Sequence, residues 1–457
     1  METLSDSLAA WAAALKLEDI PRPAIDAAKR CIIDVVGVGL AGCRAPVSQT
    51  AKKIAFQEYP PGPCLVFGSE PKLSPRGAAF CNGVFSHCLD FDDTCYDGIV
   101  HGSAAVWPAV LAAGEAAGAC GEEVLTAFVA GVEIEYFLGR FFTHHLYMKG
   151  WWNSAVLGVI GAAAAAAKVQ GFDETAMRYT IRNAVCYAFG TRAVLGTQLK
   201  PMAMGDVPAA GIYASITARN GLAGPADVFE SPRGFTQIFN DGVSNEAALE
   251  GLGRQYSLVD PGVAFKLYPV CSAAQAGAEV LGQILNTHDL SCGDVAEVVC
   301  QVPTLVGVCL VYDDPASVTQ SQFSMPFALG CILAYGRLGV EHLNQETLRD
   351  PKRVRESLKV KMVEKGDFKA PGYDAAIHPE AALVTVTTTS GRTCQMFNGA
   401  ATGMPVNPMA DDQLDGKFLS CARTLLPPGG AAALLKSLRS IEEVRHIGQL
   451  LRDCGCQ

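Results

Sequence analysis

The chain has 457 residues, of which 49% are hydrophobic and 18% charged, and its formal net charge is −10. At roughly 150 residues per domain this length suits two or three structural units, and the composition excludes an intrinsically disordered chain. The acidic balance argues against binding nucleic acid or anionic membranes through bulk charge, so the expected partners are small molecules and further copies of the chain.

From Leu4 to about Gly221, apolar residues recur three and four positions apart, which predicts helices almost throughout, with breaks at prolines and glycines such as Pro60 to Pro63. The apolar stretch 153–167 is shorter than the ~20 residues needed to cross a bilayer and predicts a buried helix. Its Gly158, Gly161 and alanine run would let neighbouring helices approach closely. A GxGxxG pattern at 37–42 closes a segment of helical period, which favours helix packing over dinucleotide binding.

From about Pro261 the pattern changes. Alternation of β-branched residues predicts strands at 295–302, 358–363 and 382–389, mixed with helices near 273–286 and 323–338. After Gly403 the helical period returns, at 411–422 and 431–452. The sequence therefore predicts an α+β unit that follows a helical one, with more helix behind it.

The 17 cysteines lie scattered between Cys31 and Cys456 without a CxxC pair. This pattern matches neither a disulfide framework nor a zinc or iron–sulfur site, so we expect mostly buried thiols in a reducing compartment. The first residues carry acid where a targeting peptide carries base, which favours a cytoplasmic location, with a mitochondrial one left open.

The densest polar cluster spans residues 90–103, with four carboxylates, a threonine and His101 between two apolar segments. Such groups line a pocket or are heavily hydrogen-bonded, and loop capping is the plain alternative. Lys200 and Lys266 stand in surroundings of low charge, bounded by proline and glycine, and suit an anionic ligand unless they are ordinary surface lysines. Together with His101 they favour proton transfer on a carboxylate.

Several segments, in this order along nearly the whole chain, resemble the MmgE/PrpD family, which includes 2-methylcitrate dehydratase, cis-aconitate decarboxylase and iminodisuccinate epimerase. They are residues 19–21 and 34–42, the 90–94 segment with His101 and Ser103, 150–154, Lys200 with Pro201, 266–269, 323–327, 407–409 and 417–418. The resemblance implies a mainly α fold. A large all-helical domain would comprise residues 1–260 and 403–457, and a smaller α+β lid domain residues 261–402. It also implies a cleft at the domain junction, a homodimer, and no metal or organic cofactor.

Position by position, the resemblance assigns Asp90, Thr94 and His101 to the family's acidic loop, and makes Lys200 and Lys266 the lysines associated with substrate carboxylates. Four positions depart from the family pattern: Trp152 replaces an expected catalytic histidine, Ala203 and Cys271 stand where histidines occur, and Phe327 stands where a tyrosine is common.

Dehydration or decarboxylation of a citrate-like acid requires proton carriers, and cations that stabilise the carboxylate. We expect His101 to act as acid or base, oriented by Asp90 or Asp93, with Lys200 and Lys266 holding the anion. A second proton carrier is missing. The candidates are Cys271, Tyr268, His144 and His145, and the alternative for Cys271 is an inert buried thiol.

The departures give the expected pocket an apolar wall, formed by Trp151, Trp152, Met202, Met204 and Phe327. The predicted function is a cofactor-independent lyase acting on an acid with an apolar substituent, such as an alkylated citrate or an intermediate of secondary metabolism. Two alternatives remain open: an isomerase, epimerase or cyclase, for which one base suffices, and a catalytically inactive member that binds a ligand.

Overall fold

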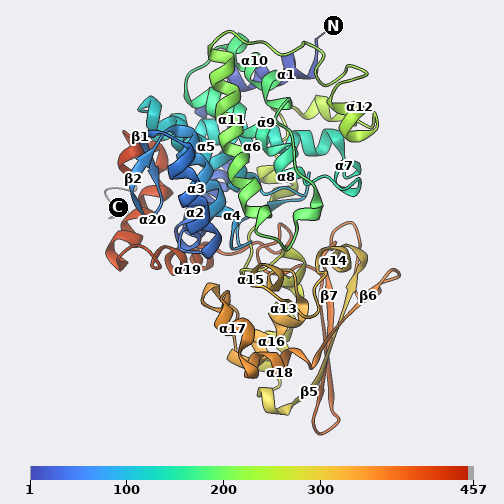
Figure 1. The fold of residues 1–457 in the computed structure, drawn as a ribbon. Helices are drawn as coiled ribbons and strands as arrows, with labels where there is room; N and C mark the ends of the chain where they lie inside the picture. The colour runs from blue at the N-terminus through green and yellow to red at the C-terminus, as the bar shows by residue number, and fades with distance from the viewer. Residues whose placement is uncertain (1, 451–457) are drawn as a thin grey trace. The chain divides into compact units, whose positions relative to one another are not determined.

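The computed structural model describes residues 2–450 (Figure 1). Within these residues the chain forms two compact units. The helical unit comprises residues 2–88, 92–263 and 411–450, and the α+β unit comprises residues 89–91 and 264–410. Residues 1 and 451–457 lie outside the described residues, and with them Cys454, Cys456 and the end of the helix expected at 431–452.

The helical unit is built from α-helices joined by short loops and single turns. The helices are α1 (Leu4–Ala14), α2 (Arg22–Gly42), α3 (Pro46–Glu58), α4 (Pro75–His87), α5 (Gly102–Ala117), α6 (Gly121–Phe142), α7 (His145–Met148), α8 (Asn153–Val156), α9 (Gly158–Val169), α10 (Glu174–Val185), α11 (Leu199–Arg219), α12 (Phe235–Asn240), α19 (Asp411–Ala422), α20 (Pro428–Arg439) and α21 (Ile447–Leu450), with the single turns η1 (Leu17–Asp19), η2 (Arg192–Val194), η3 (Glu246–Gly251), η4 (Leu258–Gly262) and η8 (Ile441–Glu443). The strands are β1 (Pro61–Val66), β2 (Ser69–Leu73) and β3 (Thr94–Cys95), and β4 (Val263–Ala264) lies at the unit boundary.

Small residues let the central helices of this unit pack closely. Helix α9 is buried along its length between α6 and α11 (Figure 1). A Cβ atom built on Gly161 of α9 would lie 2.6 Å from the carbonyl oxygen of Gly131 in α6, and one built on Gly211 of α11 would lie 2.8 Å from the Cβ of Ala162. The predicted buried helix at 153–167 is confirmed, with a break at Leu157 between α8 and α9.

Adding one methyl group at this contact should destabilise the fold. Gly161→Ala places a carbon against backbone that cannot rotate away, and such overpacking costs about 1–3 kcal/mol. Gly416→Ala is the matched control, because Gly416 lies in α19 with no atom within 4 Å of the built Cβ. The control should leave stability unchanged or raise it slightly. Thermal unfolding of both variants tests this, and equal midpoints would contradict the packing argument.

The glycines of the GxGxxG pattern lie inside helix α2 and pack against neighbours. A Cβ on Gly37 would lie 3.0 Å from the Phe418 ring, and one on Gly39 would lie 2.9 Å from the Phe67 ring. This confirms helix packing as the role of the pattern. Among residues 2–450 no single helix is long and apolar enough to cross a membrane, and α2 with α3 reaches that threshold only as a pair bent by 87°.

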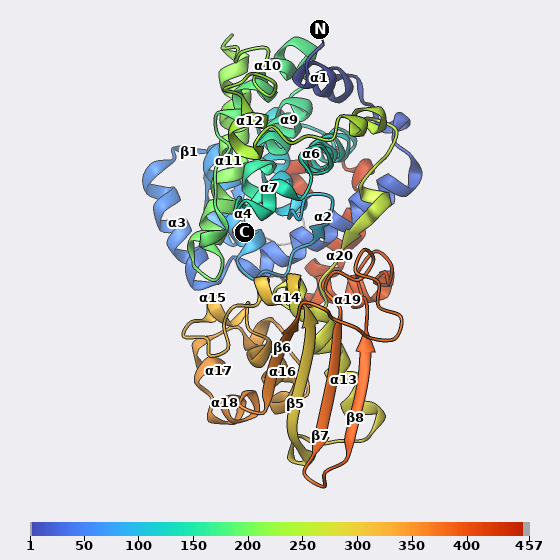
Figure 2. The same cartoon turned by 90° about the vertical axis from the view of Figure 1, so that its right-hand side faces the viewer.

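The α+β unit is built on a four-stranded sheet in the order β6-β5-β7-β8 (Figure 2). Strand β5 (Val295–Pro303) pairs in parallel with β6 (Val360–Lys365) and antiparallel with β7 (Ala382–Thr388), which pairs antiparallel with β8 (Thr393–Asn398). Val298, Val386 and Cys394 stand side by side on one buried face. Helices α13 (Gln275–Thr287) and α16 (Met325–Tyr335) cover that face (Figures 1 and 2).

The remaining elements of this unit are α14 (Thr304–Cys309), α15 (Val318–Ser321), α17 (Gln345–Arg349), α18 (Pro351–Ser357) and the turns η5 (Ser272–Ala274), η6 (Cys292–Asp294) and η7 (Val340–His342). The predicted fold class, mainly α with a smaller α+β part, is confirmed. The fifteen cysteines within the described residues are free thiols, and most are buried as expected.

Two elements differ from the sequence expectation. The predicted break around Pro60 to Pro63 is confirmed, since α3 ends at Glu58, but the chain beyond it forms the hairpin β1–β2, which was not predicted. The helix expected from 431 ends at Arg439. The chain leaves the helical path at Ser440, and beyond it the carbonyl of Val444 accepts a hydrogen bond of 2.7 Å from the backbone N–H of Gly121, the first residue of α6.

Candidate active site

The acidic loop, defined here as residues 88–101, joins α4 to α5 and is mostly buried. Two of its non-glycine residues adopt left-handed backbone conformations, Asp90 at φ 47° and Ile99 at φ 55°. A β-branched residue in this region is strained, and such strain persists only where surrounding contacts hold the backbone. The Asn153 side chain provides one such contact by donating a 2.7 Å hydrogen bond to the Gly98 carbonyl.

His101 ends this loop and is held through one ring nitrogen. Its Nδ1 lies 2.8 Å from the carbonyl oxygen of Asp93, 3.2 Å from Oδ2 of Asp92 and 3.4 Å from the hydroxyl of Thr94. A carbonyl oxygen only accepts hydrogen bonds, so Nδ1 carries the proton and Nε2 is the acceptor of the neutral ring. The side chain is 13% exposed, so the ring is not closed off from solvent.

His87, the last residue of α4, binds the same carboxylate from the other side. Its Nδ1 lies 2.8 Å from Asp92 Oδ2, its ring meets the His101 ring edge-on at 4.6 Å, and its side chain is completely buried. Burial lowers the pKa of His87 to about 4, so the ring is neutral near pH 7. Burial alone would raise the pKa of Asp92, but the two imidazoles beside it hold that pKa well below its usual range.

Lys200 and Trp152 extend this cluster. The Lys200 ammonium lies 5.8 Å from the centre of the Trp152 ring, and that ring lies 5.6 Å from the His87 ring. The Lys200 charge also contributes to the low pKa of His87. The helical unit therefore brings together Thr94, Asp93, His101, Trp152 and Lys200 of the expected site residues. Met204 is buried and Met202 half-buried on α11, the helix that carries Lys200.

The Asp93 carboxyl group points into the interior, where it accepts a hydrogen bond from the Ser103 hydroxyl. Burial and the nearby charge of Asp34 raise the pKa of Asp93 to about 7. The carboxylate that touches His101 is that of Asp92, where the sequence analysis expected Asp90 or Asp93. Asp93 instead contributes its backbone carbonyl.

Asp93→Asn should change how stability depends on pH. Because folding raises the pKa of Asp93 from 3.8 to about 7, the stability provided by its neutral form is complete below pH ~4 and is lost as the pH rises through 7. The amide of the variant does not ionise, so between pH 4 and 8 the variant should gain on the order of 4 kcal/mol relative to wild type. Unfolding measured at several pH values tests this, and a constant difference between the two proteins would contradict it.

Five expected site residues belong to the α+β unit. Nζ of Lys266 donates a 2.8 Å hydrogen bond to the carbonyl of Asp90 and lies 3.4 Å from the carboxylate of that residue. A hydrogen bond with the Cys309 thiol and burial raise the pKa of Cys271 well above its usual range, which keeps it a thiol. Burial raises the pKa of Tyr268 to about 12. Phe327 is buried, with the Arg353 guanidinium 5.2 Å from its ring centre.

Three other expected residues of the helical unit contact different partners. The Trp151 indole N–H donates a 3.0 Å hydrogen bond to the carbonyl of Phe239, and the two rings lie 4.7 Å apart. His144 and His145 are exposed, and their Nε2 atoms lie 3.0 Å from the Tyr96 carbonyl and 3.1 Å from the Asp241 carboxylate.

Comparison with known proteins identifies the family. The profile of the MmgE/PrpD N-terminal domain matches residues 6–248, and that of the MmgE/PrpD C-terminal domain matches residues 268–443. The chain belongs to the MmgE/PrpD family. Cis-aconitate decarboxylase of Homo sapiens is 27% identical over 467 residues, covering 100% of this chain and 94% of the relative. The cis-aconitate decarboxylase-like protein oryM of Aspergillus oryzae is 24% identical over 466 residues, covering 96% and 95%. Cis-aconitate decarboxylase of Aspergillus terreus is 28% identical over 302 residues, covering 62% and 61%.

Sequence reasoning missed two residues of the cluster in this MmgE/PrpD protein, His87 and Asp92. Asp92 was counted among the acids of the loop but given no role. His87 stands only three residues before Asp90, and its signal was a histidine at the end of an otherwise apolar helix. Neither spacing predicts that two imidazoles meet one carboxylate oxygen.

The same three side chains have the chemistry of a metal site. His87, Asp92 and His101 each offer a ligand atom, all within 4.8 Å of one another, and this donor set suits divalent transition metals. However, the Asp93 carbonyl beside Nδ1 of His101 requires a proton on that nitrogen, so the contacts fit hydrogen bonds. Metal-independent action of this MmgE/PrpD protein stays a prediction.

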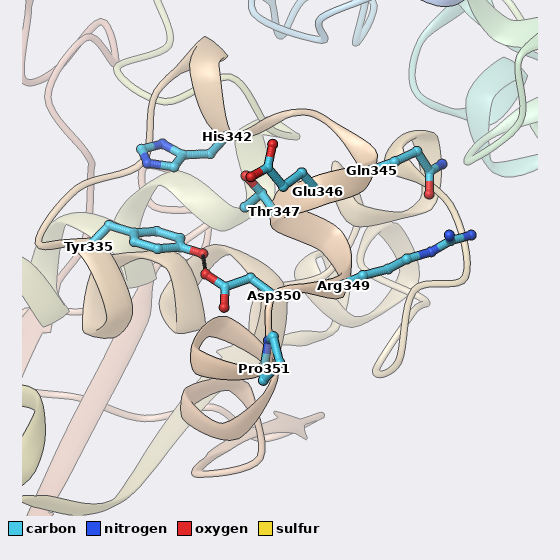
Figure 3. A pocket seen from close by; sticks show the side chains of 8 residues that line it. All are labelled: Tyr335, His342, Gln345, Glu346, Thr347, Arg349, Asp350 and Pro351. Carbon is cyan, nitrogen blue, oxygen red and sulfur yellow. Dashed lines mark hydrogen bonds between the residues drawn. The ribbon is translucent and has the colours of Figure 1, made fainter.

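The α+β unit also has a surface hollow of about 730 Å³ between Tyr335 and Pro351 (Figure 3). Figure 3 shows the Tyr335 hydroxyl bonded to Asp350, and the His342 ring stacks on Tyr335 at 4.9 Å. Asp350 also caps α18 by accepting a 2.9 Å hydrogen bond from the Lys352 N–H. These polar groups hold the corner between α17 and α18, so the cluster around His101 is the better candidate site.

Proposed function

We propose that this protein is a cofactor-independent lyase that acts by proton transfer on a carboxylic acid. The observation that carries the proposal is His101, whose Nδ1 is held by the Asp93 carbonyl and Asp92 while Nε2 stays available, with the Lys200 ammonium in the same cluster. The names of the relatives, cis-aconitate decarboxylases, support a decarboxylation. Dehydration of a β-hydroxy acid uses the same groups.

Decarboxylation of an unsaturated acid breaks the bond between a carbon and its carboxylate, and the electron pair moves into the adjacent double bond. CO2 leaves as this bond breaks. His101, protonated on both ring nitrogens, then gives its Nε2 proton to the carbanionic carbon and returns to the neutral Nδ1–H ring. In a dehydration, Nε2 instead removes the proton beside a carboxylate, and the hydroxyl group leaves as water once it is protonated. In both reactions the Lys200 ammonium stabilises a carboxylate on which negative charge builds. Proton transfer by one positioned group contributes about 10²- to 10⁴-fold in rate.

We also propose that the substrate carries an apolar substituent. Trp152 supports this, because its indole packs against both Lys200 and His87 and so gives the anion site an aromatic neighbour. Lys266 and Cys271 of the α+β unit remain proposed contributors to substrate binding and proton transfer. Lys266 is the stronger candidate of the two, because it carries an ammonium group beside Asp90 of the acidic loop. Cys271 is hydrogen-bonded with Cys309 and has a raised pKa, which keeps it a thiol.

An isomerase or epimerase is the second candidate. It is favoured by one observation: of the two imidazoles in the cluster, only that of His101 is not completely buried, and a shift of one proton within the substrate needs only one base. Such an enzyme would conserve the mass of its substrate, whereas a lyase releases CO2 or water.

The test is to incubate the purified protein with citrate, 2-methylcitrate, cis-aconitate and longer alkyl homologues, with and without a chelator. We expect release of CO2 or water, faster for the alkylated acids and unchanged by the chelator. Turnover of the small polar acids alone would contradict the apolar substituent. An isomer of unchanged mass would favour the second candidate, and loss of activity on chelation would contradict the absence of a metal. Binding of these acids without turnover would leave an inactive ligand-binding member.

A further inference from the structure

His87 is a buried polar side chain that the proposed chemistry leaves unused. Its Nδ1 is engaged with Asp92 Oδ2 at 2.8 Å, while its Nε2 is buried and has no hydrogen-bond partner in the described structure. Burying an acceptor without a partner costs free energy of desolvation. The buried Nε2 of His87 therefore lowers the stability of the fold. This cost points to a role for the other ring nitrogen, Nδ1.

That role follows from the carboxylate that the two imidazoles share. Asp92 Oδ2 contacts Nδ1 of both His87 and His101, and within the described residues its second oxygen, Oδ1, is buried without a hydrogen-bond partner. An ionised carboxylate with so few donors is stable in the interior only if each donor is retained. With its low pKa His87 is neutral, so it can supply a hydrogen bond without adding a second positive charge beside His101.

We propose that His87 is a positioning residue whose Nδ1–H holds Asp92 in place, so that Asp92 and the Asp93 carbonyl together fix the ring of His101, with Nδ1 protonated and Nε2 left for the substrate's proton. His87 itself touches no reacting atom, because its side chain is fully buried. The assignment deepens the proposed function and rests on it for the effect on turnover. The tautomer of His101, by contrast, can be observed without any substrate.

Three substitutions separate this role from packing. His87→Asn keeps an N–H donor on the atom bonded to Cγ, the place of Nδ1. His87→Gln moves the amide one bond further, toward the place of Nε2. His87→Leu removes the donor and keeps an apolar branch. If the Nδ1–H donor matters, the asparagine variant should retain function, while the glutamine and leucine variants should not.

On the acid that the wild-type protein turns over, His87→Leu and His87→Gln should lower kcat by about 10- to 100-fold with little change in KM. A loss of this size is typical when a hydrogen-bond partner that orients a functional imidazole is removed. His87→Asn should stay within about threefold of wild type, which is the rescue that a donor at this atom predicts. Equal losses in the asparagine and leucine variants, with folding retained, would overturn the proposal.

The second readout is the tautomer of His101, seen in long-range ¹H–¹⁵N spectra of protein labelled at its 8 histidines. His101 is assigned by the signals that disappear in His101→Gln. Wild type and His87→Asn should show the Nδ1–H form of His101 with closely similar signals. In His87→Leu the Asp93 carbonyl still holds the Nδ1–H, but Asp92 is no longer held in place, so the His101 signals should shift or broaden. An Nε2–H form in wild type, or His101 signals in His87→Leu that coincide with those of wild type, would overturn the proposal.

The two readouts distinguish failure of this inference from failure of the proposed function. If no acid is turned over but the His101 signals depend on a donor at residue 87, the positioning role stands and the reaction is different. If His87→Leu does not fold, the comparison of His87→Asn with His87→Gln and the wild-type spectrum still decide the matter.

Discussion

Replacing His101 with glutamine should lower kcat/KM by about 10²- to 10⁴-fold, the contribution of one positioned acid–base group. The glutamine amide can donate and accept hydrogen bonds, but it cannot carry a proton between substrate and solvent near pH 7. The glutamine amide does not occupy the place of Nδ1, through which His101 contacts Asp92 and Asp93. The hydrogen bond from the Asn153 side chain to the Gly98 carbonyl does not involve residue 101, so the variant should keep the loop folded. Steady-state kinetics on the best acid, with circular dichroism to check folding, measures the effect.

The matched control for this prediction is His145→Gln. His145 is exposed and contacts the Asp241 carboxylate at 3.1 Å, so its loss should leave turnover unchanged. Activity in His101→Gln within a few-fold of wild type would remove His101 from the mechanism. Equal losses in both variants would indicate a general sensitivity to histidine substitution.

Lys200→Met should have the second largest effect, mainly on substrate binding. Methionine keeps most of the apolar length of lysine beside Trp152 and removes the ammonium that lies 5.8 Å from that ring. A hydrogen bond to a charged group is worth about 1.5–3 kcal/mol, so kcat/KM for a dicarboxylate should fall roughly 10- to 150-fold, largely through a higher KM. Lys200→Arg keeps the charge and should recover part of the loss.

The control for the lysine is Lys149→Met, because Lys149 is a surface lysine paired with Asp241 at 2.6 Å. This variant should bind and turn over substrate like wild type. An unchanged KM in Lys200→Met would show that the acid is held elsewhere, and Lys266→Met would be the next variant to measure.

The spacing of apolar residues along the sequence predicted most helices and strands correctly, but it did not predict where each of them ends. The period of apolar residues predicted α9 and α13, and alternation predicted β5, β6 and β7, since burial of one face requires these spacings. It did not predict the β1–β2 hairpin or the end of α20 at Arg439. The hairpin pairs residues within one short segment, whose prolines predicted a break but not the pairing that follows it. The segment after α20 makes a distant contact, the hydrogen bond from the Gly121 N–H to the Val444 carbonyl.

The sequence by itself determined the fold class, the family, and the concentration of candidate chemistry in the acidic loop and Lys200, because composition, period and ordered motifs are properties of the chain. Only the tertiary structure decided which groups meet. It paired His101 with Asp92, used Asp93 through its carbonyl, and brought in His87 from the end of α4. The reason is that hydrogen-bond partners around a loop depend on backbone turns such as the left-handed Ile99, which the packing of the surrounding helices holds in place.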